Sequence, residues 1–250
     1  MTHRYVLHCD KHQQHGNLAA TMEEIKKRLF ELRQKIKTAT TNAGRDSDSV
    51  CLVAVTKSQA ITKIQEAVAA GQIDFGENYA QELLEHVGIG ENLRWHFIGH
   101  LQRNKVRQVI DKVSLIHSVD SIDLAREIDK RAAALSKIQP VLIEINLAGE
   151  ESKSGIAEAN LESLITQMNS LDHVLLKGLM TLPPYREEAE ESRPFFRRLR
   201  EIRDAINKRN LYKHPLTELS MGMSQDFEIA IEEGATLLRI GTGIFGERKH

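Results

Sequence analysis

The sequence has little cysteine, little proline and no excess of charge of either sign. Its 250 residues include 2 cysteines and 5 prolines, and 34 basic side chains against 35 acidic ones give a formal net charge of −1. This balance argues against nucleic acid as a partner, because nucleic-acid binders carry a basic excess. Cys9 and Cys51 cannot build a disulfide framework, and neither stands in a metal-ligand spacing. We therefore predict no metal site and a reducing, cytoplasmic location.

Long apolar runs are also missing. No stretch approaches the roughly 20 apolar residues of a membrane-spanning helix, so we predict no membrane contact. Residues 1–20 lack the apolar segment of a signal peptide and show no structural periodicity, and Met22 stands at the head of the first clearly helical pattern. We therefore predict a disordered N-terminal extension over residues 1–20 and a single domain over residues 21–250.

What the sequence does contain is a regular alternation of short apolar runs with amphipathic segments. After an early helix predicted from Thr21 to about Thr38, the apolar runs are Cys51–Thr56, Ile73–Gly76, Trp95–Gly99, Ser114–Ser118, Val141–Leu147, Leu175–Leu182, Thr217–Ser220 and Thr236–Ile240. Strict alternation of strand and helix favours parallel pairing, and eight strands in about 200 residues fit a closed (β/α)8 barrel. An open doubly wound sheet is the alternative, but it normally carries a glycine-rich phosphate loop after its first strand, which this sequence lacks.

Two helical patterns refine this α/β prediction. A stripe of Phe195, Leu199, Ile202 and Ile206, with Pro194 in the first turn, predicts a long helix before the seventh strand. Too little chain follows the eighth run for a long last helix, so we expect the early helix to cover that gap.

The first candidate for chemistry is Lys57, which ends the first apolar run. Ligands of such barrels bind where the strands end, at the C-terminal face. Strand alternation puts Val53, Val55 and Lys57 on one side of the strand. An amine at this rim beside apolar neighbours suits Schiff-base formation with a carbonyl, whereas the plainer interpretation is an ordinary surface lysine.

Small residues follow the seventh and eighth runs, where barrels of this kind usually bind phosphate. The two segments are Ser220-Met221-Gly222-Met223-Ser224 and Gly241-Thr242-Gly243, and Ser224 and Thr242 can each add a hydroxyl donor. Either segment alone is equally compatible with glycines that only form turns. Two such segments opposite a rim lysine indicate a phosphorylated carbonyl ligand.

Arg239 lies inside the eighth apolar run, where an arginine is costly unless it is paired. It could pair with Glu144 of the fifth run, or it could point its guanidinium at a ligand near the phosphate; the residues alone leave both open. Further rim candidates are Asn78, His96, His100 and Lys153. For His96 a buried, hydrogen-bonded histidine is favoured over a ligand contact.

Seven short segments occur in one order along the chain: Val53-Ala54-Val55-Thr56-Lys57, Phe75-Gly76-Glu77-Asn78-Tyr79, Trp95-His96-Phe97-Ile98-Gly99-His100-Leu101-Gln102, Lys153-Ser154-Gly155-Ile156, Gly178-Leu179-Met180, Ser220-Met221-Gly222-Met223-Ser224 and Arg239-Ile240-Gly241-Thr242. Together they resemble the YggS/PROSC family, the pyridoxal 5′-phosphate (PLP) homeostasis proteins, from about Met22 to Gly246. The resemblance implies a single (β/α)8 barrel of the alanine racemase N-terminal type, without the C-terminal β domain, and PLP as cofactor.

The resemblance also implies a role for each site residue. Lys57 is the Schiff-base lysine, Ser224, Gly241 and Thr242 bind the phosphate, Arg239 approaches the pyridine nitrogen, and Asn78 lies beside the ring. No residue is expected to be catalytic in its own right.

Arg239 bears on function, because a guanidinium is a permanent donor that holds the pyridine nitrogen unprotonated and weakens the ring as an electron sink. Alanine racemases share this feature but add a second domain with a catalytic tyrosine, for which the sequence leaves no room before His250. We therefore expect a non-enzymatic, monomeric protein of intracellular PLP homeostasis that exchanges PLP by transimination, with Lys153 as a candidate relay. Its expected partners are PLP, amino acids and, transiently, PLP-dependent apoenzymes.

Two alternatives stay open. One is a PLP-dependent amino-acid racemase or another weak PLP enzyme. The other is a cofactor-free barrel aldolase that uses Lys57 on a sugar phosphate.

Overall fold

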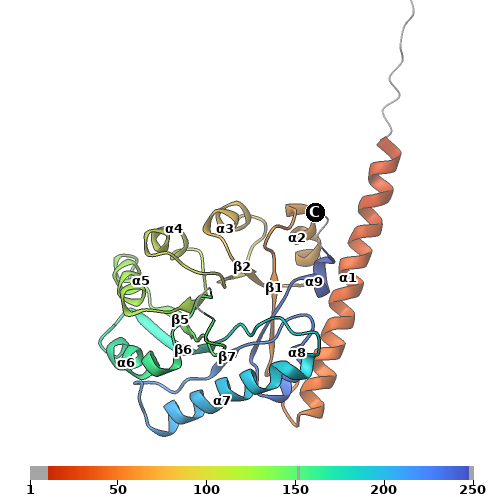
Figure 1. The fold of residues 1–250 in the computed structure, drawn as a ribbon. Helices are drawn as coiled ribbons and strands as arrows, with labels where there is room; N and C mark the ends of the chain where they lie inside the picture. Colours follow the sequence, from red (N-terminus) through yellow and green to blue (C-terminus); the bar gives the residue numbers. More distant parts are fainter. Residues whose placement is uncertain (1–10, 151–152, 248–250) are drawn as a thin grey trace, which may run out of the picture.

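A closed barrel of eight parallel strands forms the centre of the molecule (Figure 1). The computed structural model describes residues 11–150 and 153–247, with side chains from residue 23 onward. Each strand pairs with its neighbours in sequence, and β1 pairs with β8 to close the barrel. This closure confirms the predicted (β/α)8 barrel and excludes the open doubly wound sheet.

Each of the eight predicted apolar runs overlaps a strand. The strands are β1 Cys51–Val55, β2 Asp74–Glu77, β3 Arg94–Phe97, β4 Leu115–Val119, β5 Gln139–Glu144, β6 Val174–Met180, β7 Glu218–Ser220 and β8 Leu237–Ile240. The α-helices are α1 Lys11–Asn42, α2 Ile61–Ala69, α3 Ala80–His86, α4 Val106–Val109, α5 Ile122–Ala134, α6 Glu158–Met168, α7 Arg193–Lys208, α8 Phe227–Glu232 and α9 Thr242–Phe245, with 3-10 helices η1 Arg103–Lys105 and η2 Ala189–Ser192. The largest shift is in β5, which ends at Glu144 because Ile145 pairs beyond it only in an isolated bridge with Ile156.

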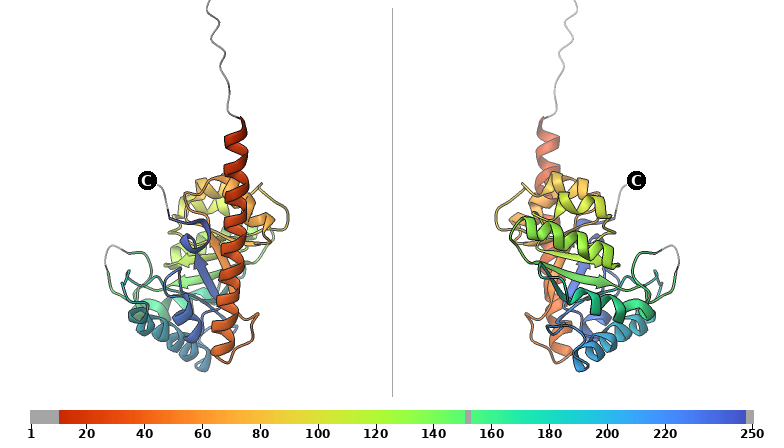
Figure 2. Two further views of the ribbon diagram at one scale, coloured as in Figure 1. Left: turned by 90° about the vertical axis from the view of Figure 1, so that its right-hand side faces the viewer. Right: turned by 90° about the vertical axis from the view of Figure 1, so that its left-hand side faces the viewer.

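Helix α1 lies along the outside of the barrel and contacts α2, α8 and α9 (Figures 1 and 2). Its inner stripe of Ile25, Leu29, Leu32 and Ile36 is buried. Because α9 has only 4 residues, α1 supplies the cover that a long last helix would otherwise give. The expected role of the early helix is therefore confirmed.

The bounds of α1 differ from the predicted Thr21 to Thr38. The helix runs from Lys11 to Asn42, and its first turns project beyond the barrel (Figure 2). The predicted disordered extension of residues 1–20 stays a prediction, since residues 1–10 lie outside the described part of the chain. From Lys11 onward the backbone is helical, which differs from the expected lack of regular structure over residues 11–20.

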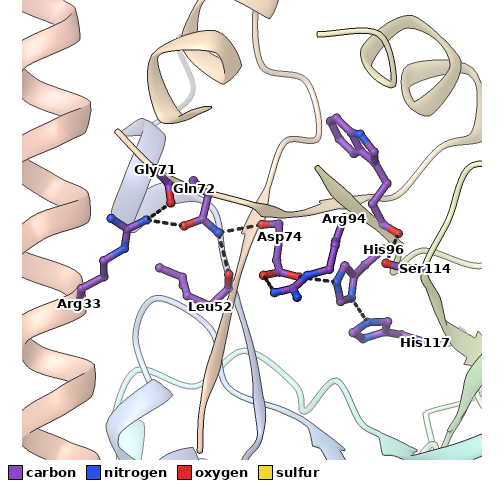
Figure 3. Close-up of polar contacts among 10 residues, drawn as sticks. Arg33, Leu52, Gly71, Gln72, Asp74, Arg94, His96, Ser114 and His117 are labelled. Carbon is purple, nitrogen blue, oxygen red and sulfur yellow. Dashed lines mark hydrogen bonds and ion pairs between the residues drawn. The ribbon is translucent and has the colours of Figure 1, made fainter. Parts of the chain in front are cut away.

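Arg33 fixes α1 to the N-terminal end of the barrel (Figure 3). Its guanidinium donates to the carbonyl oxygen of Gly71 at 2.9 Å and to Gln72 Oε1 at 3.1 Å. The Gln72 amide donates in turn to the carbonyl oxygen of Leu52 in β1, at 2.7 Å. These contacts position the start of the strand that leads to Lys57.

The buried apolar side chains form two clusters. The larger one lies between strands and helices and includes Phe75, Phe97 and Phe196. The smaller one consists of Val53, Leu115, Leu142, Met180 and Leu237. Alternation along β1 and β8 puts Val53 and Leu237 on the inward side, so this second cluster fills part of the barrel interior. Buried polar side chains share that interior.

Helix α7 has Pro194 in its first turn, as predicted. Its buried stripe is Phe196, Leu199, Ile202 and Ile206. The prediction of Phe195 at the head of the stripe is wrong, because i+3 spacing from Leu199 leads back to Phe196 and leaves Phe195 half-buried.

Candidate functional site

A cavity of about 710 Å³ opens at the C-terminal end of the barrel. Its lining includes all six residues predicted to contact a cofactor, namely Lys57, Asn78, Ser224, Arg239, Gly241 and Thr242. Arg239 lies in β8 and the other five follow β1, β2, β7 or β8, so the closed barrel brings together residues that are far apart in sequence. Their individual cofactor contacts stay predictions.

Lys57 stands two residues beyond the end of β1. Val55 and Lys57 both line the cavity, which confirms the shared side predicted from alternation. Ser58 adopts a left-handed backbone conformation, with φ of 57°, that turns the chain away directly after the lysine. The Lys57 Nζ atom lies 5.0 Å from the centroid of the Tyr79 ring, within cation–π range. An aromatic face thus supports the amine at the rim of the cavity.

A buried carboxyl group holds the residue before Lys57. The Thr56 hydroxyl hydrogen-bonds to Glu77 Oε1, and His86 Nδ1 lies 2.7 Å from the same oxygen. Burial raises the pKa of Glu77, although the hydrogen bonds of Thr56 and His86 act against this rise. The contact joins the end of β1 to β2 and restricts the backbone from which Lys57 projects.

Asn78 reaches the cavity from the loop after β2, beside Gly99 after β3. A Cβ atom on Gly99 would lie 2.3 Å from the Asn78 carbonyl oxygen, a distance that real Cβ atoms do not adopt. Glycine is therefore required for the two loops to approach. Their contact sets the position of Asn78 on the cavity wall.

The loops after β7 and β8 meet at Ser224. The Thr242 hydroxyl donates to Ser224 Oγ at 2.9 Å, and the backbone N–H of Gly243 donates to the same atom at 3.1 Å. The turn before Ser224 requires Gly222, whose φ is 92° and whose Cβ would lie 2.6 Å from the Ala230 Cβ. Two hydroxyls and a backbone N–H therefore converge, as in sites for phosphate oxygens.

Arg239 is buried on β8 below these loops. Its Nη1 donates to Ser220 Oγ at 2.5 Å and its Nη2 to the Thr181 carbonyl oxygen at 2.9 Å. Burial lowers the pKa of Arg239 to about 10, and nearby Glu144 opposes that change, so the guanidinium is charged at neutral pH. Ser220 and Thr181 are thus its partners, and no direct ion pair with Glu144 occurs in this part of the structure.

Glu144, at the end of β5, lines the same cavity. Burial raises the pKa of its carboxyl to about 7, with Arg239 lowering it and Asp120 adding to the rise. This carboxyl therefore exchanges its proton near neutral pH, which makes it a candidate acid or base.

The remaining rim candidates separate into two groups. His100 and Lys153 line the cavity, His100 3.5 Å from Asp120 and Lys153 3.5 Å from Glu150 in ion-pair contacts. His96 is buried below it, and its ring hydrogen-bonds to other polar side chains, which confirms the buried interpretation.

Two further observations limit the chemistry. Over residues 23–150 and 153–247, whose side chains the structure describes, no three His, Cys, Asp or Glu side chains gather in a way that could hold a metal ion. Within residues 11–150 and 153–247, none of the helices combines the length and the apolar character needed to cross a membrane.

Sequence reasoning assigned no role to Glu77, Tyr79 or Ser220. A signal for each was present, since Glu77 and Tyr79 flank Asn78, and Ser220 lies two residues before Gly222 on an inward-facing strand position. What the sequence could not supply was the pairing of these side chains with Thr56, Lys57 and Arg239.

Similarity to known proteins is extensive. Residues 28–249 match the family model described as alanine racemase, N-terminal domain. A pyridoxal phosphate homeostasis protein from Aquifex aeolicus is 46% identical over 225 residues, which is 89% of this chain and 98% of that protein. The protein of the same name from Escherichia coli strain K12 is 39% identical over 236 residues, 92% of this chain and 99% of that one.

Solved structures show the same relationship. PipY from Synechococcus elongatus PCC7942, solved with PLP bound, has a TM-score of 0.78 and 35% identity over 89% of this chain and 100% of its own. Alanine racemase from Corynebacterium glutamicum has a TM-score of 0.69 at 17% identity, and the match covers 91% of this chain and 62% of the racemase. The racemase likeness shows a shared barrel fold.

Proposed function

This chain belongs to the family of pyridoxal phosphate homeostasis proteins, and from that premise we propose that it binds PLP in the cavity and helps to control intracellular vitamin B6. One observation carries the proposal: Lys57, the Ser224–Thr242 contact and Arg239 all line one cavity.

The donor set in the cavity fits PLP. The cofactor supplies an aldehyde that condenses reversibly with amines, and it carries a phosphate and a pyridine nitrogen. Lys57 offers the amine, Ser224, Thr242 and the Gly243 N–H offer donors for the phosphate, and Arg239 offers a permanent donor.

Lys57 forms the Schiff base in this proposal. Its Nζ atom bonds to the aldehyde carbon as water leaves, and Tyr79 and the Thr56–Glu77 contact hold the lysine at the rim. Asn78 borders the ring, Gly241 leaves space beside Val55, and the guanidinium of Arg239 donates to the pyridine nitrogen.

Exchange of PLP follows from the open rim. Lys153 lines the cavity as a second amine and, by transimination, can receive PLP from Lys57 and pass it on. Free amino acids or a lysine of a PLP-dependent apoenzyme are the recipients, and the protein acts as a cytoplasmic monomer. It is not an enzyme in this proposal, because the Arg239 donor weakens the pyridine ring as an electron sink.

An amino-acid racemase or weak PLP enzyme is the second candidate. Glu144 favours it, since its carboxyl lines the cavity and its pKa is raised, through burial, to about 7, where a catalytic base is effective. Steady turnover of an amino acid to its mirror image, lost in Lys57→Ala, would establish this function over homeostasis alone.

Borohydride trapping followed by peptide mass spectrometry tests the proposal. Wild-type protein mixed with PLP should become yellow and, after reduction, carry a phosphopyridoxyl group on the peptide that contains Lys57. Lys57→Arg keeps the charge but removes the reactive amine, and it should lose both signals, while Lys63→Arg on α2 should keep them. A colourless wild-type protein would instead favour the cofactor-free aldolase, and an adduct unchanged in Lys57→Arg would refute the assignment.

A further inference from the structure

Five polar side chains form one hydrogen-bonded column through the barrel interior. They are Arg239 on β8, Ser220 on β7, His117 on β4, His96 on β3 and Asp74 on β2, and all five are buried. Arg239 Nη1 lies 2.5 Å from Ser220 Oγ, and Ser220 Oγ lies 2.8 Å from His117 Nδ1. His117 Nε2 lies 2.9 Å from His96 Nδ1, and His96 Nε2 lies 3.1 Å from Asp74 Oδ1.

The column connects the two ends of the barrel. Arg239 lines the cavity at the C-terminal end, whereas Asp74 is the first residue of β2. There Arg94, the first residue of β3, donates to both oxygens of Asp74, from Nε at 2.7 Å and from Nη2 at 2.6 Å (Figure 3). Figure 3 shows His96 beside this carboxylate and His117 beside His96.

Barrel stability does not explain the column. Barrel interiors are usually filled by branched apolar side chains, and buried ionic groups replaced by well-packed apolar ones often leave stability unchanged or raised. Here the inward apolar cluster has five members, and polar groups occupy the neighbouring positions. Departures from an apolar core are expected at sites of function.

When both histidines are neutral, the two ends of the column fix the direction of every hydrogen bond in it. Asp74 is ionised, because hydrogen bonds from His96 and Arg94 outweigh burial and hold its pKa well below the ordinary value. An ionised carboxylate only accepts, so His96 must donate from Nε2, and a neutral His96 then accepts at Nδ1.

The same logic continues to the cavity. His117 donates from Nε2 to His96 and accepts at Nδ1, so the Ser220 hydroxyl donates to His117. The Ser220 oxygen is then oriented to accept from Arg239, which can only donate. Burial is the largest cause that lowers the pKa of His117 well below its ordinary value, in agreement with a neutral ring.

We infer that four residues, Ser220, His117, His96 and Asp74, are positioning residues for Arg239. Together they hold the Arg239 guanidinium at the floor of the cavity, where it is a directed hydrogen-bond donor for the ring of the cofactor. The inference rests on the proposed PLP site and adds four residues that act on it through Arg239.

Protonation of the histidine pair would reverse the direction of the hydrogen bonds between His96, His117 and Ser220. If His96 took up a second proton, its Nδ1 would donate to His117, and His117 would donate from Nδ1 to Ser220. Ser220 would then accept from both sides, and its own proton would lose its acceptor. Within the described part of the chain, the other charged or titratable groups that act on the column are Arg94 and Cys51 at the Asp74 end and Glu144 and Asp226 at the Arg239 end.

NMR of protein labelled with ¹⁵N-histidine, without PLP, tests the direction of the hydrogen bonds. At neutral pH, His96 and His117 should both carry their single proton on Nε2. Asn variants of each histidine assign the signals. A proton on Nδ1 of either buried ring, or a doubly protonated ring at neutral pH, would overturn the inference.

PLP affinity and its pH profile test the action on Arg239. Ser220→Ala and His117→Leu should weaken PLP binding about tenfold, the effect of losing one hydrogen bond to a charged group. Asn at position 117 can still accept from Ser220, so His117→Asn should recover most of the affinity. His173→Asn alters a histidine that contacts the Lys137 carbonyl oxygen outside the column, and it should match wild type.

The two proposals fail in different ways. Folded Ser220→Ala and His117→Leu proteins that bind PLP with wild-type affinity and pH profile would refute the positioning role, even if Lys57 still carries the borohydride adduct. Loss of the Lys57 adduct in wild type would refute the PLP site, while the NMR result would still report the column. If either variant fails to fold, Ser220→Thr replaces it, because this variant keeps the hydroxyl. Folded Ser220→Thr should bind PLP within a few-fold of wild type. A tenfold weaker affinity would count against the inference.

Discussion

Glu144 and Arg239 face the same cavity, and burial acts on their charges with different results. Burial raises the pKa of Glu144 to about 7, so this carboxyl is only partly ionised at neutral pH. Burial also lowers the pKa of Arg239 to about 10, yet the group is still a cation at neutral pH. The cavity therefore has a positive bias, which suits a phosphorylated ligand.

Glu144 should make the protein less stable as the pH rises. Its pKa in the folded protein, about 7 through burial, exceeds the ordinary 4.5, so the folded state binds more protons between these values. The group's contribution is complete below 4.5 and is lost as the pH rises to about 7, by about 3 kcal/mol. Urea unfolding across this range should show the loss in wild type and not in Glu144→Gln. Equal slopes in the two proteins would contradict it.

His117 should have the opposite effect in acid. Burial lowers its pKa in the folded protein well below 6.5, so below 6.5 the unfolded state binds more protons than the folded state. Its neutral form is compatible with folding above 6.5, and stability is lost as the pH falls from 6.5 toward the folded pKa. Urea unfolding of His117→Asn should lack this acid-side loss, while His173→Asn should retain it. If acid lowers the free energy of unfolding equally in wild type and in His117→Asn, the result would count against a neutral His117.

At the scale of elements, the strands were predictable because each overlaps a short apolar run bounded by polar residues, and parallel burial on both faces produces that pattern. The ends of the elements and the register of the helices were harder to predict from the sequence. Phe195 and Phe196 are both apolar and adjacent, and only packing selects Phe196 for the buried stripe of α7. The site residues that follow strands were predictable from barrel geometry, whereas partners of Lys57 and Arg239, such as Tyr79 and Ser220, depend on contacts between elements.

The close approach of two loops at Gly99 gives a test at this scale. In Gly99→Ala, the new Cβ would meet the Asn78 carbonyl oxygen at 2.3 Å, so the loop after β2 must shift. We expect a loss of about 1–3 kcal/mol in the free energy of unfolding, as for overpacked cores, together with weaker PLP binding. Gly88→Ala is the matched control, because no atom lies within 4 Å of its added Cβ. Equal stability and PLP affinity in the two variants would show that the approach is not needed.

The hydrogen bonds of Arg33 give a second test between elements. Arg33→Ala removes charged donors to the Ala70 and Gly71 carbonyl oxygens and to Gln72, which tie α1 to the start of β2. Hydrogen bonds to charged groups contribute about 1.5–3 kcal/mol each, and because Arg33 is half-buried we expect a total loss near the lower value. Lys35→Ala, on the exposed side of α1, should change the free energy of unfolding by less than about 0.5 kcal/mol. Comparable losses in both variants would indicate a general effect on helix propensity.

At the scale of the whole molecule, the barrel is completed by its first helix. The last helix, α9, is short, and α1 packs against α2, α8 and α9 from the opposite end of the chain. Barrel and α1 therefore form one cooperative unit, in which the start of the chain stabilises the loops after β8 that border the cavity. Figure 2 shows the first turns of α1 projecting beyond the barrel.

Two truncations separate the projecting part of α1 from the part that packs. The buried stripe begins at Ile25, which is 2% exposed, and continues with Leu29 at 0%. Removal of residues 1–20 leaves this stripe and Arg33 intact, so the free energy of unfolding and the PLP affinity should stay within about 0.5 kcal/mol of wild type. Removal of residues 1–29 deletes both buried side chains and should cost about 2–5 kcal/mol for each, with PLP binding weakened through the exposed α9. Urea unfolding and PLP titration of both truncated proteins test whether residues 1–20 are dispensable. Equal losses of unfolding free energy in the two truncations would instead place residues 1–20 within the cooperative unit.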